Sequence, residues 1–243
     1  MAKLKDKKEI QIMREAGSKL STVMESLKKE VSPGKTTKDL EEKAKELISK
    51  EGGKPSFLGY KEFPAAICTS VNRIVVHGIP SDRVLNKGDI ISIDIGLEWK
   101  GYHSDMAVTV PVGKISRKAE KLLRVTEESL DLAIKQSKKG KRLGDIGNAV
   151  EKHVTENGLV VVRGLCGHGI GKEVHENPQI MNTGSANRGW KIREGFTFCI
   201  EPMVTFENPK IYHDKEGIKT ENISAHFEHT IAIVDGNPEI LTA

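Results

Sequence analysis

Apolar residues recur every three or four positions through the first fifty residues, and this period predicts two amphipathic helices. The first helix spans about 6–30 and ends at Ser32-Pro33-Gly34. The second spans about 37–51, and Gly52-Gly53 gives its stop signal. A helical pair is therefore expected in this region.

Between 55 and 114 the hydrophobic period changes to two and turn residues become frequent, so this region is expected to form a sheet. The helical period returns at 116–138 and at about 145–157. Strands and loops follow from 159 onward. The order helix, helix, sheet thus occurs twice, which predicts a mixed α/β (α+β) fold.

The two helix-helix-sheet stretches also resemble each other in sequence, as the halves of an internal repeat do. We interpret the chain as a single domain, 1–243, built from two related halves at approximately 1–113 and 114–243. Each half is expected to supply two carboxylates from its strands. Three pairs of segments match in the same order: 34–40 with 140–146, 87–94 with 194–201, and 103–110 with 226–233.

The segment 89–110 alternates like a β-hairpin and carries the two acidic residues of the first half. A turn at Glu98-Trp99-Lys100-Gly101 would place Asp94 directly opposite Asp105, with Cβ atoms about 4.5–5.5 Å apart. Like charges in such a pair destabilise a sheet unless a cation lies between them. The alternative, that one carboxylate faces solvent or that the register differs, stays open at this point.

The second half is expected to mirror this arrangement with Glu201 and Glu228. Four ionised carboxylates about 5 Å apart repel by roughly 3 kcal/mol per pair at an effective dielectric of about 20. Summed over all pairs, this repulsion exceeds the net stability of a domain, about 5–15 kcal/mol. Two divalent cations would balance the four charges, as in two-metal hydrolytic sites. Oxygen ligands with one imidazole suit Mn, Fe, Co or Zn.

Three histidines in predicted loops or turns are candidates for that imidazole or for catalysis. His168 lies in Gly167-His168-Gly169-Ile170-Gly171, where the glycines suggest a bare loop that a ligand approaches closely. His77 and His175 stand in similar turn settings, one in each half. A single loop histidine is usually a surface residue, and that alternative stays open for each of them.

At these residues the sequence resembles the type I methionine aminopeptidases, and the resemblance covers essentially the whole chain. It implies the pita-bread fold, an α/β structure with two pseudo-two-fold related halves and a central antiparallel sheet, in agreement with the repeat. The motifs that carry the resemblance are Val76-His77-Gly78-Ile79-Pro80, Ile93-Asp94-Ile95-Gly96, His103-Ser104-Asp105, Gly167-His168-Gly169-Ile170-Gly171, Ile200-Glu201-Pro202-Met203 and Phe227-Glu228-His229-Thr230.

The resemblance implies a dinuclear metal centre whose two ions are Co, Mn, Fe or Zn. Asp105 and Glu228 would bridge the two ions, Asp94 would hold one of them, and His168 and Glu201 would hold the other. A water or hydroxide between the metals would attack the carbonyl group that follows an N-terminal methionine.

The resemblance also implies roles for the remaining polar candidates. Glu201 would act as general base and acid. His175 would stabilise the tetrahedral oxyanion, and His77 would hold the scissile amide or its leaving nitrogen.

Family members wall the methionine side-chain pocket with aromatic residues and a cysteine. Tyr60, Phe63 and Cys68 fall at matching positions. Phe57 stands where a small or thiol residue is frequent, Val174 stands where an aromatic residue is common, and a tryptophan typical of the pocket has no counterpart. The alternative reading of these residues as ordinary core stays open.

Composition and charge limit the class of protein and the cellular compartment that the sequence predicts. Of 243 residues, 37% are hydrophobic and 30% are charged, which excludes disordered and low-complexity classes. The three cysteines include no CxxC pair, which is typical of reduced thiols in a cytoplasmic protein. No apolar run approaches the roughly 18 residues of a membrane span, and the first residues lack a secretory signal. The net charge of +4 is expected to reflect solvated surface lysines rather than a DNA-binding patch.

The expected function is removal of the initiator methionine from nascent polypeptides, with a preference for a small second residue. A monomer with transient ribosome contact through its Lys-rich surface is expected. Two alternatives on the same fold are an Xaa-Pro aminopeptidase or dipeptidase, whose usual extra N-terminal domain has no room in 243 residues, and a non-catalytic binding module. Chemistry alone would also permit a two-metal phosphohydrolase.

Overall fold

The computed structural model describes residues 3–207 and 209–243. Met1 and Ala2, the first residues of the stretch predicted to carry no secretory signal, lie outside the described residues. Within the described part of the chain, no helix combines the length and the apolar character needed to cross a membrane.

Four helices form where the hydrophobic period predicts them, with bounds that differ by up to two residues. They are α1 (Lys7–Glu30), α2 (Thr37–Lys50), α3 (Arg117–Gln136) and α4 (Leu143–Glu156). The Asp6 carboxylate sets the start of α1, because it accepts hydrogen bonds from the first backbone N–H groups of that helix.

The strands form one large sheet and two small ones, and pairing is antiparallel throughout the named strands. The large sheet runs in the order β1-β4-β5-β14-β9-β7-β8, with β2 also paired to β4 and β15 to β14. Its strands are β1 (Lys54–Pro55), β2 (Ile67–Val71), β4 (Ile90–Trp99), β5 (Tyr102–Pro111), β7 (Cys166–Gly169), β8 (Glu176–Met181), β9 (Thr197–Ile200), β14 (Glu228–Val234) and β15 (Asn237–Ile240).

The small sheets complete the strand inventory of the described residues. One contains β6 (Val160–Val161), β10 (Met203–Thr205) and β13 (Ser224–His226). The other contains β3 (Ile74–Val76), β11 (Tyr212–Asp214) and β12 (Gly217–Lys219). A 3-10 turn, Tyr60–Glu62, follows β1.

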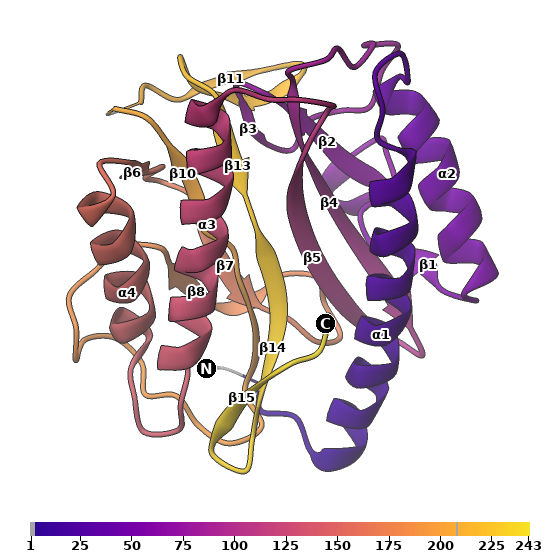
Figure 1. The fold of residues 1–243 in the computed structure, drawn as a ribbon. Coiled ribbons are helices and arrows are strands. Elements are labelled where there is room, and N and C mark those ends of the chain that lie inside the picture. Colours follow the sequence, from indigo (N-terminus) through magenta and orange to yellow (C-terminus); the bar gives the residue numbers. More distant parts are fainter. Residues whose placement is uncertain (1–2, 208) are drawn as a thin grey trace.

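The two halves of the repeat meet at the centre of the large sheet, where β5 of the first half pairs with β14 of the second. Figure 1 shows α1 and α2 beside the strands of the first half, and α3 and α4 beside those of the second. Isolated bridges join Thr36 to Val84 and Arg142 to Lys191, at positions that the predicted repeat places in correspondence. The mixed α/β fold with a central antiparallel sheet is therefore confirmed.

Alternation along the strands separates an apolar face from a polar one. On β4, Ile91 and Ile93 join the buried cluster that holds Leu20 of α1 and Leu40 of α2. Asp94, the next residue along the strand, points to the other face. The helices therefore cover one side of the large sheet, and the acidic residues project from the opposite side.

The predicted hairpin of β4 and β5 exists, but its predicted register is wrong by two residues. The turn consists of Lys100 and Gly101, both with positive φ (51° and 78°), as a two-residue hairpin turn requires. Asp94 therefore pairs with Ala107, and Asp105 pairs with Gly96. A shift of two keeps both carboxylates on the same face, because side chains alternate with a period of two.

Candidate metal centre

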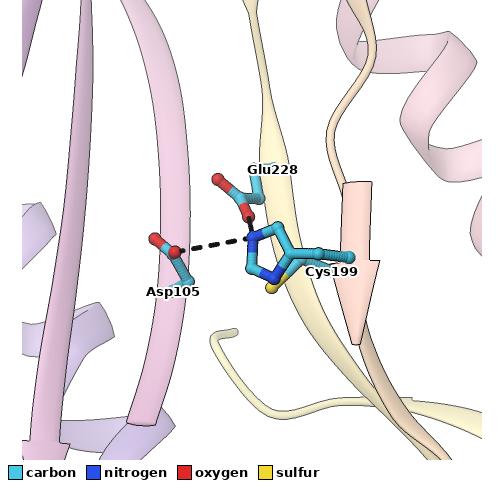
Figure 2. A group of neighbouring side chains, drawn as sticks. Asp105, Cys199 and Glu228 are labelled. Atoms are coloured by element: carbon cyan, nitrogen blue, oxygen red, sulfur yellow. Dashed lines mark ion pairs between the residues drawn. The ribbon is translucent and has the colours of Figure 1, made fainter. Parts of the chain in front are cut away.

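The four predicted carboxylates come together on the polar face of the large sheet. Asp94 lies on β4, Asp105 on β5 and Glu228 at the start of β14, and all three are buried. Glu201 directly follows β9, whose last residue pairs with the residue after Glu228. Figure 2 shows the side chains of Asp105 and Glu228 reaching from neighbouring strands into the same space.

The register explains why this space stays open. Ala107 pairs with Asp94 on one side and with Glu228 on the other, so it stands between these two carboxylates in a row across three strands. Its side chain is a single methyl group. The row therefore leaves room for cations between the flanking carboxylates, which a larger residue would fill.

His168 adds an imidazole from β7, which lies beside β9. Its Nε2 atom lies 3.6 Å from Glu201 Oε1, 3.9 Å from Asp105 Oδ2 and 3.9 Å from Glu228 Oε1. Its Nδ1 lies 3.0 Å from the carbonyl oxygen of Gly169, which only an Nδ1–H can satisfy. The lone pair of Nε2 therefore faces the carboxylates, in the tautomer that metal-binding histidines adopt.

The predicted bare loop around His168 is wrong, because these residues form a strand. A Cβ atom on Gly167 would lie 2.3 Å from the carbonyl oxygen of Cys199, and one on Gly169 would lie 2.6 Å from that of Asn177. The glycines let β7 approach the neighbouring chain segments closely. Gly167 and Gly169 therefore have a role in strand packing that the sequence reasoning did not identify.

Burial sets the protonation of the cluster. It raises the pKa of all four carboxyl groups, and neighbouring acidic groups raise those of Asp105, Glu201 and Glu228 further. Burial also lowers the pKa of His168 to about 4. The imidazole is therefore neutral at pH 7, and its contacts with the carboxylates are not ion pairs of a charged histidine.

The residues fit divalent cations. Asp94 Oδ1, Asp105 Oδ1 and Glu228 Oε1 are buried and have no hydrogen-bond partner among the described residues. Buried polar atoms are costly to leave unpaired, so a ligand is the expected partner. Carboxylate oxygens with a neutral imidazole are typical ligands of Mn, Fe, Co and Zn.

The sequence reasoning missed two buried residues of this cluster. Cys199 contributes a sulfur to a group with Asp105, His168 and Glu228 whose ligand atoms all lie within 4.8 Å of one another (Figure 2). His226 forms a second such group with Glu201 and Glu228. The signal for His226 was present, since the repeat aligns 226–228 with 103–105.

The centre opens into a cavity of about 510 Å³, which all eleven of the predicted site residues line. Tyr60 and His175 lie at its edge, where the Tyr60 hydroxyl is 3.0 Å from His175 Nδ1 and the two rings are stacked. His77 follows β3 in the left-handed region (φ 59°) and also faces the cavity. Desolvation, with a smaller contribution from neighbouring His168, lowers the pKa of His175, which is therefore neutral at pH 7.

The predicted pocket wall also assembles in one place. Phe57, Cys68 and Val174 form a buried apolar cluster, against which Tyr60 and Phe63 pack. Four of these five residues line the cavity beside the carboxylates, while Val174 lies behind them. An apolar surface and a polar centre thus share one cavity.

The mouth of the cavity holds polar residues that the sequence reasoning did not identify. Lys61 and Glu62 border it in the left-handed region of the backbone, and His213 and Lys215 border it from β11 and the turn that follows. Lys61 and Glu62 directly follow Tyr60, which was predicted to line the pocket. Their place in the sequence could therefore have indicated that they lie near the cavity.

Comparisons with known proteins agree with this arrangement. The sequence profile described as metallopeptidase family M24 matches residues 11–235. "Methionine aminopeptidase 1" of Bacillus subtilis (strain 168) is 46% identical over 242 residues, which cover 98% of each chain. The crystal structure of the methionine aminopeptidase from Thermotoga maritima superposes with a TM-score of 0.97 at 40% identity, covering 100% of this chain and 99% of that one.

More distant structures share the fold alone. The prolidase from Pyrococcus furiosus superposes with a TM-score of 0.80 at 24% identity, over 99% of this chain and 65% of that one. The pita-bread fold implied by the resemblance is confirmed by these superpositions. With the family profile matched along nearly all of its length and close relatives covered end to end, this chain belongs to metallopeptidase family M24, within the group of the methionine aminopeptidases.

Proposed function

We propose that this protein is a dinuclear-metal aminopeptidase that removes the N-terminal methionine from nascent polypeptides and prefers a small second residue. One observation carries the proposal: four carboxylates and a neutral imidazole converge in the same cavity as an apolar wall. The polar centre suits hydrolysis of a peptide bond, and the apolar wall suits the methionine side chain.

The side chains at the floor of the cavity would hold the cations. Asp105 and Glu228 would bridge two ions, Asp94 would complete one site, and His168 with Glu201 would complete the other. Divalent cations, when bound, lower the pKa of a water molecule and polarise the scissile carbonyl group. Ionised carboxylates would also balance the added positive charge.

Three residues would move or hold protons during hydrolysis. Glu201 would take a proton from the attacking water and return it to the leaving amine, a role for which a raised pKa suits a carboxyl group. The Tyr60 hydroxyl would donate to Nδ1 of His175, which would leave the Nε2–H free to donate to the oxyanion. His77 would hold the leaving nitrogen at the rim.

Hydrolysis of Xaa-Pro bonds is the weaker candidate. The prolidase similarity rests on 24% identity, whereas methionine aminopeptidases are similar from end to end. The apolar cluster of Phe57 and Cys68 beside the carboxylates also favours selection of an apolar first side chain.

Cleavage of three peptides by the protein loaded with Co²⁺ or Mn²⁺ would test the proposal. Met-Ala-Ser should be cleaved, while Met-Lys-Ser should remain nearly intact because of its long second residue. Comparable turnover of Lys-Ala-Ser would contradict the methionine assignment. Cleavage of Ala-Pro with none of Met-Ala-Ser would select the Xaa-Pro alternative.

The cellular setting remains a prediction: action in the cytoplasm, as a monomer, with transient ribosome contact and without DNA or membrane partners. Sedimentation of the protein alone and with ribosomes would measure its oligomeric state and this contact. Sedimentation of the protein alone as a dimer would contradict the predicted monomer.

A further inference from the structure

His226 ends β13, two residues before Glu228, and its side chain is only 1% exposed. Neither ring nitrogen has a hydrogen-bond partner among the described residues. The backbone is fixed by Thr109, whose hydroxyl bonds to the His226 N–H and carbonyl oxygen, both at 2.8 Å. A buried imidazole without partners, held on a fixed backbone, calls for a ligand.

The ring is aimed at two of the carboxylates. His226 Nε2 lies 3.7 Å from Glu201 Oε2 and 3.8 Å from Glu228 Oε2. These distances exceed a hydrogen bond, so simple donation to a carboxylate does not account for the ring. Ligand atoms of a tetrahedral Zn²⁺ site stand about 3.3 Å apart, given metal–ligand bonds of about 2.0–2.2 Å. If the side chains of His226, Glu201 and Glu228 moved a few tenths of an ångström closer together, all three could bind one cation.

The two glutamates stand between two histidines. Each turns its Oε1 toward His168, at 3.6 and 3.9 Å, and its Oε2 toward His226. The same pair of carboxylates thus offers a cation position on each side. The position beside His168 belongs to the centre of the proposed function, whereas the position beside His226 is additional.

We propose that His226, Glu201 and Glu228 form an additional cation position on the inner side of the metal centre, suited to Zn²⁺ or Co²⁺. This inference rests on the proposed function, since it places Glu201 and Glu228 in a centre that already holds cations. Imidazole with carboxylate oxygens favours Zn²⁺ and Co²⁺ over Mg²⁺ or Ca²⁺.

Charge predicts that this position fills last. Two divalent cations already balance the four carboxylates, so a third adds uncompensated positive charge to a buried site. It should therefore bind more weakly and fill only at excess cation. When it is filled, both oxygens of Glu201 are engaged, so this carboxylate can no longer take a proton and excess Zn²⁺ or Co²⁺ should inhibit hydrolysis.

The test is a Co²⁺ titration by calorimetry, comparing the unchanged protein with His226→Gln and His213→Gln. The unchanged protein should show a weak binding step after the tight ones, and His226→Gln should bind one equivalent fewer while keeping the tight steps. His213→Gln, which alters an exposed histidine at the cavity mouth, should keep the weak step. Identical isotherms for the unchanged protein and His226→Gln, or loss of the weak step in His213→Gln instead, would overturn the proposal.

A second measurement needs no variant. The exchangeable N–H proton of an imidazole bound to Co²⁺ gives a strongly shifted NMR signal, so one signal should belong to His168 and a further one should rise with the weak step. Absence of that further signal at saturation would overturn the additional position. Because excess Co²⁺ should inhibit hydrolysis, cleavage is assayed with only the tight positions filled. If the further signal appears at excess Co²⁺ but Met-Ala-Ser is not cleaved with the tight positions alone filled, the proposed function fails alone; if the peptide is cleaved and no weak step is seen, this inference fails alone.

Discussion

The chemistry of the centre depends on which atoms of single residues face the cavity. Hydrogen bonding of His168 Nδ1 to Gly169 directs the Nε2 lone pair toward the carboxylates. Without this bond the ring could rotate or change tautomer, and the cations would lose a neutral ligand. Ala107 has an equally local role, because its small side chain keeps apart the carboxylates of Asp94 and Glu228 without filling the space.

Replacement of Asp105 with Asn tests the bridging carboxylate. Mutation of a residue that only hydrogen-bonds to a metal ligand lowers metal affinity or activity roughly 10–100-fold. Loss of a ligand itself should therefore lower kcat/KM by more than about 100-fold. Asp82→Asn, at an exposed position, serves as the control and should match the unchanged protein. Retained Co²⁺ binding and turnover in Asp105→Asn would contradict the metal assignment.

Replacement of Ala107 with Val tests the open space without altering any ligand. The added methyl groups occupy the gap between Asp94 and Glu228, so Co²⁺ affinity should fall at least about 10-fold. Overpacking should also lower the free energy of unfolding by about 1–3 kcal/mol. Ala119→Val adds the same groups to the buried face of α3 and should lose stability only. Equal Co²⁺ affinities of the two variants in calorimetry would contradict this role of Ala107.

At the scale of elements, strand pairing positions the residues of the candidate metal centre. The Lys100-Gly101 turn fixes the register of β4 and β5, and with it the row from Asp94 through Ala107 to Glu228. On the other side, β7 reaches the centre only because its glycines permit close contact with neighbouring backbone. Strand geometry, rather than loop geometry, therefore sets most of the distances in the site.

Replacement of Gly167 with Ala tests the close approach of β7. The new Cβ would lie 2.3 Å from the Cys199 carbonyl oxygen, so β7 and the adjacent His168 must shift. Stability should fall by about 1–3 kcal/mol and Co²⁺ affinity should fall with it.

Gly34→Ala provides the matched control for this change. Gly34 has a positive φ of 93° and open space around it, so alanine there should cost about 1–2 kcal/mol of stability without changing Co²⁺ affinity. Urea unfolding and calorimetry measure the two quantities. A Gly167→Ala variant with normal affinity would show that His168 does not depend on this contact.

At the scale of the whole molecule, the centre lies where the two halves meet. Asp94 and Asp105 belong to the first half, and His168, Glu201 and Glu228 belong to the second. Thr230 joins them further, because its hydroxyl bonds to both the backbone N–H and the carbonyl oxygen of Asp105. Neither half therefore contains a complete site.

The division into halves within a single domain remains a prediction, and unfolding can test it. Because β5 and β14 pair at the centre, both halves should unfold in one transition. The two tryptophans, Trp99 and Trp190, lie in different halves, so Trp190→Phe and Trp99→Phe leave one fluorescent reporter in each. Coincident urea midpoints, after correction for each substitution by circular dichroism, are expected. Separated midpoints would indicate two domains.

Removal of metal should make stability depend on pH. In the metal-free protein, the raised pKa values of the buried carboxyl groups mean that the folded chain holds protons that the unfolded chain has released by pH 7. The free energy of unfolding should then fall as the pH rises from about 4, where the carboxyl groups of the unfolded chain ionise, to about 7, the folded-state pKa of Asp94, by about 1.4 kcal/mol per pH unit for each proton held. Bound Mn²⁺ should abolish this slope, because cations favour the ionised carboxylates. Equal slopes with and without Mn²⁺ in urea unfolding would contradict the prediction.

Much of the fold could be predicted from the sequence because its signals are local. The helices follow from a period of three to four and from capping residues such as Asp6, and the alternation of β4 assigns Asp94 to the polar face. The register of β4 against β5 could not be predicted from the sequence in the same way. It depends on which two residues occupy the centre of the turn, Trp99 and Lys100 as predicted or Lys100 and Gly101 as observed, and Lys100 is an uncommon residue for a position with positive φ.

Local sequence patterns were sufficient to predict the order of helices and strands, the face of β4 that carries Asp94, and the residues whose motifs resemble the family. Only the tertiary structure decided the pairing of Asp94 with Ala107, the strand conformation around His168, and the position of His226 behind Glu201 and Glu228. The reason is physical. Periodicity and capping act between residues a few positions apart, whereas a metal centre depends on distances between strands that are far apart in the chain.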